Sequence, residues 1–464
     1  MSHLDRKGAE KVKKLRLLLL SVTAGLCLAL LSGCSLKSPE DLYTLPRPPE
    51  EYDLLQQAIT RVQQELGTTY STTVEYAAPL SGYNIQPVQM LDLDDDGVQE
   101  SAAAFFRVTG AENPLMIYLF RQSSDGSYEV YAVIEGGGSA INRVSYEDLD
   151  GAPGKEIVVH WQMSDDVHLL GAYSLSTGSV RALLITSYTD YALLDMDMDG
   201  KMELMLVTLG ADGAGRADYY DYSAEMDSLV LDSTAPLSTG LTGVEELETN
   251  FVMDMLPALY VTGRLSSGGL ITDILVNGEN GLSNVTLDPV TGSSTRTLCL
   301  RDVFGTDINS DAVLELPGLT FLPEYGVPLS TDSMWTITWM QYDAQGTAHP
   351  VCTTYHNERD GWYLILPDIW QGQLTLLRTD QLNQGERAVT FCRWSGAAEE
   401  EPEAFLTIYT LTGTNRAVRA ALGDRFTLME DSTTIYAAEF QGDWDCGLDE
   451  ESLLANFNLI RTEW

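Results

Sequence analysis

The sequence predicts a mainly β protein built from a repeated unit of about 50 residues, and two recurring patterns predict it. One is a short acidic loop that leads into an apolar stretch of strand-forming residues. The other is a hairpin in which two apolar or aromatic stretches flank a turn, and its turns are centred on Gly126, Gly178, Asp227, Gly292 and Gly346. Such a unit, with about four short strands, has the size of one blade of a β-propeller. We therefore expect a propeller of about six or seven blades over residues 71–380.

A helix is expected ahead of the repeats, over residues 51–70. Its apolar residues have the spacing of one helix face: Leu54, Leu55, Ala58, Ile59, Val62 and Leu66. We expect this helix to cap the repeats, and we expect Gly67 to end it, because glycine is the usual residue just beyond a helix C-terminus.

Residues 381–464 depart from the repeat. Strand-like stretches such as AFLTIYTLTG and TTIYAAEF are followed by the helical pattern EESLLANFNLI. The sequence leaves open whether this region is a last blade or a small domain of mixed α and β structure.

The acidic loops repeat one pattern of oxygen-bearing side chains. Two copies are complete and carry acids at positions one, three, five and nine, with glycine at position six: Asp92, Asp94, Asp96 and Glu100, then Asp195, Asp197, Asp199 and Glu203. Two copies are weaker: Asp148, Asp150 and Glu156, then Asp307, Asn309, Asp311 and Glu315. More degenerate copies are expected to end at Asp273 and to surround Asp360.

Crowded carboxylates repel one another unless a cation joins them, and ligand sets made only of oxygen suit Ca²⁺. We therefore predict Ca²⁺ in these loops, with a structural role. The alternative is that they are plain turns, in which Asp and Gly serve the turn geometry alone. An EF-hand is excluded, because position twelve is Ala103 or Leu206 and the flanking segments are strand-like.

The D-x-[DN]-x-D-G-x-x-[DE] pattern before an apolar strand resembles the loops of FG-GAP/VCBS repeats, the blades of integrin-α-type propellers. The resemblance covers about residues 80–365 and implies a calcium-binding propeller. Three copies depart from it: position five is Ala152 in the second, the fourth lacks the glycine, and the copy that ends at Asp273 has lost nearly all its acids.

Residues 1–33 resemble a secretory signal, with a basic start and an apolar run that is too short to span a membrane comfortably. The run Leu31-Ser32-Gly33-Cys34 resembles the lipobox of bacterial lipoproteins, in which the cysteine is acylated after the leader is removed. This resemblance implies a lipid anchor on Cys34 and a body on the extracytoplasmic face of a bacterial cell membrane. Residues 34–50 would then be the lipidated cysteine and a proline-rich tether. The alternative is an ordinary signal peptide or a signal anchor.

The composition narrows the function classes. The chain has a formal net charge of −41, which should repel nucleic acid and anionic lipid headgroups. No HExxH, GxSxG or P-loop pattern occurs. His160 and His168 could approach a common site with Asp165 or Asp166, although a strand histidine and an unrelated loop histidine are the simpler interpretation. Cys299, Cys352, Cys392 and Cys446 form no CxxC pair, and we expect them to be free and buried rather than disulfide-bonded.

These observations favour a calcium-stiffened binding or scaffold module for protein or glycan at the cell envelope. The alternatives are a surface polysaccharide hydrolase or lyase on a propeller scaffold, and a helper in envelope assembly. Exposed aromatic rings would suit sugar or peptide binding, and the C-terminal third offers Trp335, Trp339, Trp362, Trp370 and Trp394. Burial inside blades is the competing explanation for these tryptophans.

Overall fold

A computed structural model describes residues 50–460, except for 166, 176–178, 211–212, 326–333, 384 and 398. The predicted signal segment, Cys34 and nearly all of the tether therefore lie outside the described residues, as does the predicted turn at Gly178. The chain divides into two compact units, one that runs to Glu65 and includes Gln122–Glu129, and one that holds the rest. Among the described residues, no helix combines the length and the apolarity needed to cross a membrane.

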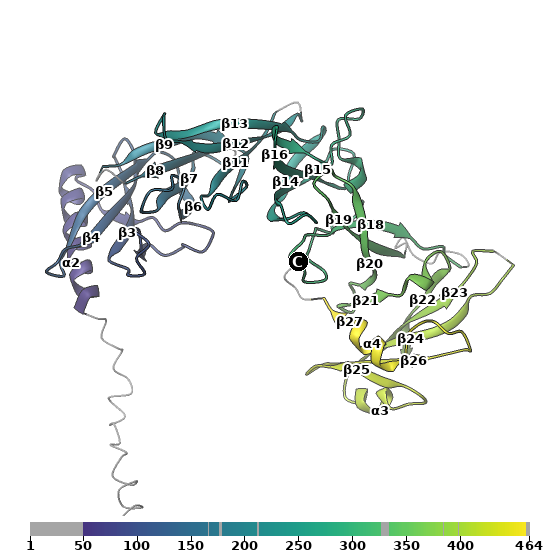
Figure 1. Ribbon diagram of the computed structural model, residues 1–464. Coiled ribbons are helices and arrows are strands. Elements are labelled where there is room, and N and C mark those ends of the chain that lie inside the picture. The colour runs from purple at the N-terminus through teal and green to yellow at the C-terminus, as the bar shows by residue number, and fades with distance from the viewer. Residues whose placement is uncertain are drawn as a thin grey trace, which may run out of the picture. The chain divides into compact units, whose positions relative to one another are not determined.

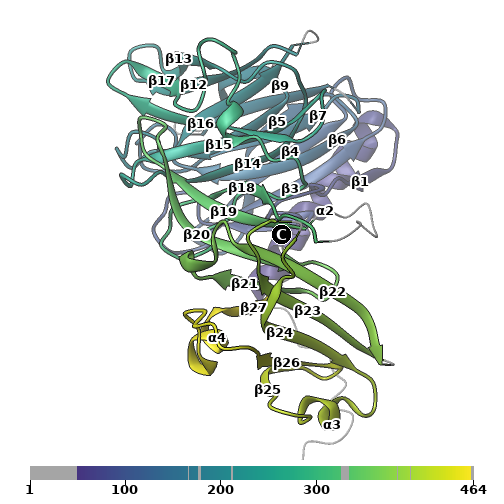
Figure 2. The same cartoon turned by 90° about the vertical axis from the view of Figure 1, so that its right-hand side faces the viewer.

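The described part of the chain is mainly β, as the sequence predicts. Its strands form six antiparallel sheets, which follow one another along the sequence (Figures 1 and 2). The first sheet contains β1 (Val74–Tyr76), β2 (Val88–Leu91), β3 (Ser101–Val108), β4 (Leu115–Gln122) and β5 (Tyr128–Gly136). The second contains β6 (Ala140–Glu147), β7 (Glu156–Gln162), β8 (His168–Ser174) and β9 (Arg181–Tyr188). The third contains β10 (Asp190–Leu194), β11 (Glu203–Leu209), β12 (Gly215–Ser223) and β13 (Ser228–Pro236).

The remaining three sheets continue this arrangement. The fourth contains β14 (Leu241–Phe251), β15 (Pro257–Leu265), β16 (Leu270–Gly278) and β17 (Gly281–Asn284). The fifth contains β18 (Leu316–Phe321), β19 (Trp335–Tyr342), β20 (Ala348–Asn357), β21 (Trp362–Leu366) and β27 (Phe457–Leu459). The sixth contains β22 (Leu374–Asn383), β23 (Glu386–Arg393), β24 (Glu403–Thr412), β25 (Phe426–Glu430) and β26 (Thr434–Phe440).

The apolar core lies between consecutive sheets. Strands such as β3, β7, β11 and β15 are buried on both faces, which explains why they read as continuous apolar runs rather than as alternating patterns. Buried clusters join the first sheet to the second, the second to the third, and so on to the sixth. This packing fixes the strand ends, and with them the loops that connect neighbouring strands.

The N-terminal helix α2 spans Glu50–Tyr70, so the prediction that Gly67 ends it is wrong. The helix instead ends at Ser71, which adopts a left-handed φ of 54°, and the Thr72 N–H donates to the Gly67 carbonyl at 3.2 Å. A Cβ on Gly67 would lie 3.2 Å from the Thr72 carbonyl oxygen, so glycine here makes room for the returning chain. The predicted apolar face is buried at Leu55, Ala58, Ile59, Val62 and Leu66, and Leu54 is half-buried.

The chain turns at Gly292, where a single antiparallel bridge joins Asp288 and Ser293, but the two strands predicted to flank this turn do not form. The hairpin of this repeat lies earlier, where Gly278 pairs with Gly281 between β16 and β17. The segment around Gly292 is irregular and contains a short 3₁₀ helix over Thr295–Thr297. Threonine hydroxyls replace strand pairing here: the backbone N–H groups of Thr272 and Ile274 on β16 donate to the side chains of Thr297 and Thr286.

The C-terminal region forms the sixth sheet and then returns to the fifth. The sixth sheet begins at Leu374, before the predicted boundary at residue 381, and includes the short helix α3 (Arg416–Ala420) between β24 and β25. A second short 3₁₀ helix, Asp368–Trp370, precedes it. Helix α4 (Glu450–Asn456), capped by Asp449 and Ser452, leads into β27, which pairs with β21.

Most of the tryptophan and cysteine side chains in the C-terminal part of the chain are buried. Four of the five tryptophans considered above are buried, and Trp335 is half-buried, so they pack sheets rather than form an exposed aromatic patch. The four cysteines are free: Cys299, Cys392 and Cys446 are buried and Cys352 is half-buried.

Candidate metal centres in the acidic loops

Three of the four acidic loops connect the same kind of strand pair. They join β2 to β3, β6 to β7 and β10 to β11, and the fourth loop directly precedes β18. In three of them the residue before the loop pairs with the glutamate at position nine: Glu147 with Glu156, Leu194 with Glu203, and Thr306 with Glu315. This shared register places the glutamate at the base of its loop, where the sheet begins.

The backbone of the loop follows one path in three copies. Position four has a left-handed φ at Asp95, Met198 and Ser310, between 59° and 62°. Position six is left-handed as well, at Gly97, Gly200 and Ala312. The aspartate at position one accepts a hydrogen bond from the N–H of position six in each, at 2.9–3.0 Å. Ala312 thus keeps the shape of the loop without glycine, at a conformational cost of about 1–2 kcal/mol.

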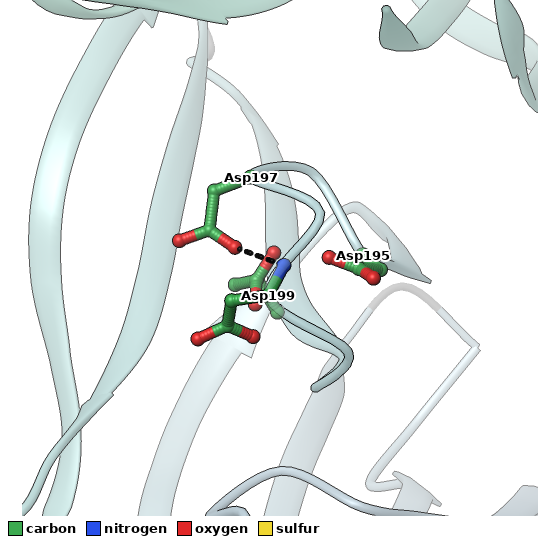
Figure 3. Close-up of side chains that lie close together, drawn as sticks. Asp195, Asp197 and Asp199 are labelled. Carbon is green, nitrogen blue, oxygen red and sulfur yellow. Dashed lines mark hydrogen bonds between the residues drawn. The ribbon is translucent and has the colours of Figure 1, made fainter.

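The loop at 195–203 gathers all four predicted ligands. Ligand oxygens of Asp195, Asp197, Asp199 and Glu203 lie within 4.8 Å of one another. Figure 3 shows Asp197 and Asp199 on the turn, where the Asp199 N–H donates to the Asp197 carboxylate at 3.1 Å, with Asp195 beside them. Glu203 is 1% exposed, and its Oε2 accepts a hydrogen bond from the Met196 N–H at 2.7 Å.

Two oxygens in this loop are buried without a hydrogen-bond partner: Glu203 Oε1 and Asp195 Oδ1. An unsatisfied buried carboxylate oxygen is costly, and its cost is removed when a cation binds it. Burial, together with the neighbouring aspartates, raises the pKa of Glu203 to about 7. The loop therefore has the carboxylate ligands of a cation site, together with buried negative charge that a bound cation would neutralise.

The loop at 92–100 gathers Asp92, Asp94 and Asp96 but not Glu100. The strand register explains the difference, because Leu91 pairs with Ser101 rather than with the glutamate. A shift of one residue turns alternate side chains to the opposite face of a strand. Glu100 is half-buried, and burial together with the three aspartates raises its pKa.

In each of the two weaker loops the structure groups all three of the predicted acids. These groups are Asp148, Asp150 and Glu156 in one loop, and Asp307, Asp311 and Glu315 in the other. The predicted ligand Asn309 lies in the same turn, where its amide donates to the Asp311 carboxylate at 2.9 Å. Gln341 on β19, which the sequence reasoning missed, donates to both Asp311 and Glu315 at 2.8 and 2.7 Å. Amide donors thus already satisfy part of the negative charge in that loop.

Two lysines, which the sequence reasoning also missed, accompany the first three loops. The Lys155 ammonium lies 2.9 Å from the Asp95 carboxylate in the preceding loop. The backbone N–H of Lys155 donates to the Leu93 carbonyl at 2.8 Å. Lys201 lies 2.8 Å from Asp199 in its own loop. The Met202 N–H donates to the Asp148 carbonyl at 2.8 Å, so the second loop is hydrogen-bonded to both the first and the third.

The two degenerate copies hold no acidic group. The segment that ends at Asp273 is the β15–β16 turn and the middle of β16, and Asp273 is fully buried among hydroxyl and amide donors. Asp360 lies in the β20–β21 turn and pairs with Arg387. These two segments were therefore assigned wrongly to the loop repeat, because Gly and Asp also mark ordinary hairpin turns.

The metal-free protein should lose stability as the pH rises. Burial raises the pKa of Glu156, Glu203 and Glu315 to about 7 in the folded chain, whereas an unfolded glutamate titrates near 4.5. Each group is therefore protonated in the native state and ionised in the unfolded state over this interval. In EDTA we expect the melting temperature to fall between about pH 5 and pH 7, and we expect Ca²⁺ to remove most of that fall. A pH-independent melting temperature in EDTA would contradict the assignment of these buried acids.

The predicted histidine pair is close in space. His160 Nε2 on β7 and His168 Nδ1 on β8 lie 3.1 Å apart. Asp165 is exposed in the turn between these strands, and Asp166 lies outside the described residues. Burial, the neighbouring His168 and Arg143 lower the pKa of His160 to about 4, so this imidazole is neutral at physiological pH.

Comparisons with known proteins assign no family. No protein-family model matches the chain, and no curated protein matches it in sequence. Among solved structures, similarity is found to the periplasmic gluconolactonase PpgL of Pseudomonas aeruginosa, with 14% identity, 67% of this chain and 82% of that chain covered, and a TM-score of 0.27. It is also found to TolB from Acinetobacter baumannii, with 12% identity, 66% and 65% covered, and a TM-score of 0.25. At these TM-scores the similarities assign neither a fold family nor an activity.

Proposed function

We propose that this chain is a calcium-stiffened binding or scaffold module of the bacterial cell envelope, with its sheets arranged as the blades of a propeller. A lipid on Cys34 would anchor it to the extracytoplasmic face of the membrane, and its ligand would be a protein or a glycan. Ca²⁺ would stiffen the loops between strands and would take no part in chemistry.

One observation carries the calcium part of this proposal. The loop at 195–203 places four carboxylates around one point, and two of their oxygens are buried without a hydrogen-bond partner. Protein oxygens in an irregular arrangement suit Ca²⁺, whereas Mg²⁺ demands near-octahedral geometry and gives up its water reluctantly. The loop at 92–100 offers three further carboxylates with the same backbone path.

Thermal unfolding of the exported form tests this part. The protein would be residues 34–464 with Cys34→Ser, melted in EDTA, in millimolar Ca²⁺ and in millimolar Mg²⁺. A cation that binds only the native state at 100 times its Kd adds about 2.7 kcal/mol, which is a shift of several degrees in Tm. A shift with Ca²⁺ that Mg²⁺ does not reproduce would support the proposal, and equal melting curves in all three conditions would refute it.

Cell fractionation tests the anchor. The full chain, expressed with its first 33 residues, should sediment with membranes, and its Cys34→Ser variant should leave that fraction, because the acyl chains supply the membrane affinity. A Cys34→Ser chain that stays in the membrane fraction would instead indicate an uncleaved signal anchor.

A further inference from the structure

The histidine pair belongs to a second cluster of side chains, separate from the acidic loops. His160 and His168 lie on neighbouring strands of the second sheet, diagonally placed, since Gln162 is the residue opposite His168. Glu156, which belongs to the acidic loop, begins the same strand as His160, four residues earlier. That spacing corresponds to roughly 13 Å along a strand. The two groups therefore cannot share one ion.

Aromatic rings enclose the two imidazoles. Tyr188 lies directly opposite His168 on β9, and its ring centroid is 5.0 Å from that of His160 and 6.2 Å from that of His168. Tyr191 on β10 packs edge-on against His160 at 5.8 Å. His160 is 9% exposed and His168 is half-buried. An apolar surrounding of this kind favours neutral imidazole, which is the form that binds metal ions.

Two features of the cluster point to a ligand. His160 Nε2 and His168 Nδ1 are hydrogen-bonded to each other at 3.1 Å, and both nitrogens become free to bind an ion when the imidazole protons move to His160 Nδ1 and His168 Nε2. Two Zn–N bonds of about 2.0–2.1 Å that meet at a tetrahedral angle place their nitrogens about 3.3 Å apart, so the pair already has nearly the bite of a two-histidine site. In addition, Tyr188 is only 7% exposed, and its hydroxyl is buried without a hydrogen-bond partner.

We propose that His160 Nε2 and His168 Nδ1 bind a first-row transition-metal ion of the Zn²⁺ or Cu²⁺ class, and that the Tyr188 hydroxyl contributes to this site as an oxygen ligand or through a metal-bound water. Nitrogen ligands select these ions over Ca²⁺, which prefers oxygen. The charged groups on the adjoining strands are Arg143 on β6 and Asp190 on β10, and the half-buried Asp190 carboxylate is the one that offsets the charge of the ion. The site is independent of the calcium loops.

Zn²⁺ titration by calorimetry tests the proposal on the Cys34→Ser protein, with saturating Ca²⁺ present to occupy the acidic loops and a phosphine reductant present to keep the thiols reduced. We expect about one Zn²⁺ per chain at the histidine site. His168→Gln should weaken that binding at least 10-fold, and Tyr188→Phe should weaken it less. His349→Gln is the matched control, because His349 is a partly exposed histidine that pairs with Asp343 on another sheet, and it should leave the affinity unchanged.

His168 is half-buried, so its substitution should leave the fold intact, which an unchanged far-UV circular dichroism spectrum and an unchanged Tm in EDTA would verify. Electron paramagnetic resonance of bound Cu²⁺ supplies a second measurement, with nitrogen hyperfine structure expected in the parent protein and lost in His168→Gln. Equal Zn²⁺ affinity in the parent and His168→Gln proteins would overturn the proposal. Glu203→Gln should keep the Zn²⁺ site, so a failure of the calcium proposal would be seen separately.

Discussion

Replacing Asp273 with alanine is expected to lower the free energy of unfolding by about 3–5 kcal/mol, the largest effect of any substitution considered for this chain. The Asp273 carboxylate is fully buried on β16 and accepts four hydrogen bonds. The donors are the Ser238 N–H at 2.8 Å, the Ser238 hydroxyl at 2.7 Å, the Ser294 hydroxyl at 2.5 Å and the Asn284 amide at 2.8 Å. Alanine would leave the Ser238 N–H and hydroxyl without this acceptor in an interior that water does not reach, and would remove one of the partners of Ser294 and Asn284.

Urea unfolding, followed by tryptophan fluorescence, measures this difference. Asp232→Ala is the matched control, because Asp232 is an exposed aspartate on β13 of the third sheet and its loss should change stability by less than about 0.5 kcal/mol. Similar unfolding midpoints for the two variants would mean that the hydroxyl network around Asp273 is not a stabilising centre of the fourth sheet.

Glu203→Gln is expected to have opposite effects with and without calcium. In EDTA at pH 7 the variant should be at least as stable as the parent, because it removes a buried acid that lies beside Asp195, Asp197 and Asp199. In millimolar Ca²⁺ it should melt several degrees below the parent, because a neutral amide is a poorer calcium ligand than a carboxylate and much of the cation's stabilisation is lost. The reversal of sign separates a cation site from a glutamate that is needed only for packing.

Glu100→Gln provides the control for that reversal. It removes the glutamate at the same position of the other complete loop, but the structure keeps Glu100 out of the acidic group. Its calcium response should therefore match that of the parent protein. A loss of calcium response as large as that of Glu203→Gln would show that the register of β2 and β3 rearranges when the cation binds.

The spacing of acids predicts the places of the loops well but not their complete ligand sets. Asp-x-Asp-x-Asp-Gly fixes turn geometry locally, so the loop at 195–203 could be located from residue types alone. The exclusion of Glu100 depends on whether Leu91 pairs with Ser101 or with the residue before it. Strand packing determines this register, and the spacing of the acids in the sequence does not predict it.

Long-range partners account for two of the other differences from the sequence predictions. Gln341 on β19 donates to Asp311 in the fourth loop, and no residue near Asp311 in the sequence predicts this contact. The segment around Gly292 alternates polar and apolar residues like a hairpin, yet its hydroxyls bond to β16 and to Asp273. Gly67 carries a helix-ending signal, but the helix ends where Ser71 takes the left-handed conformation. In the first two cases a tertiary contact outweighs a local preference, whereas the end of the helix is decided by local backbone geometry.

The pairing of β27 with β21 sets a folding order for this half of the chain. Asn458 on β27 lies opposite Tyr363 on β21, and in the sequence all strands of the sixth sheet lie between these two strands. The second and third sheets pair only strands adjacent in sequence, so they can form early and locally. β27 can complete the fifth sheet only after the residues of the sixth sheet have been synthesised, and until then the edge of β21 that β27 covers is available to other chains. Contacts between nascent chains at β21 are therefore the expected route to aggregation.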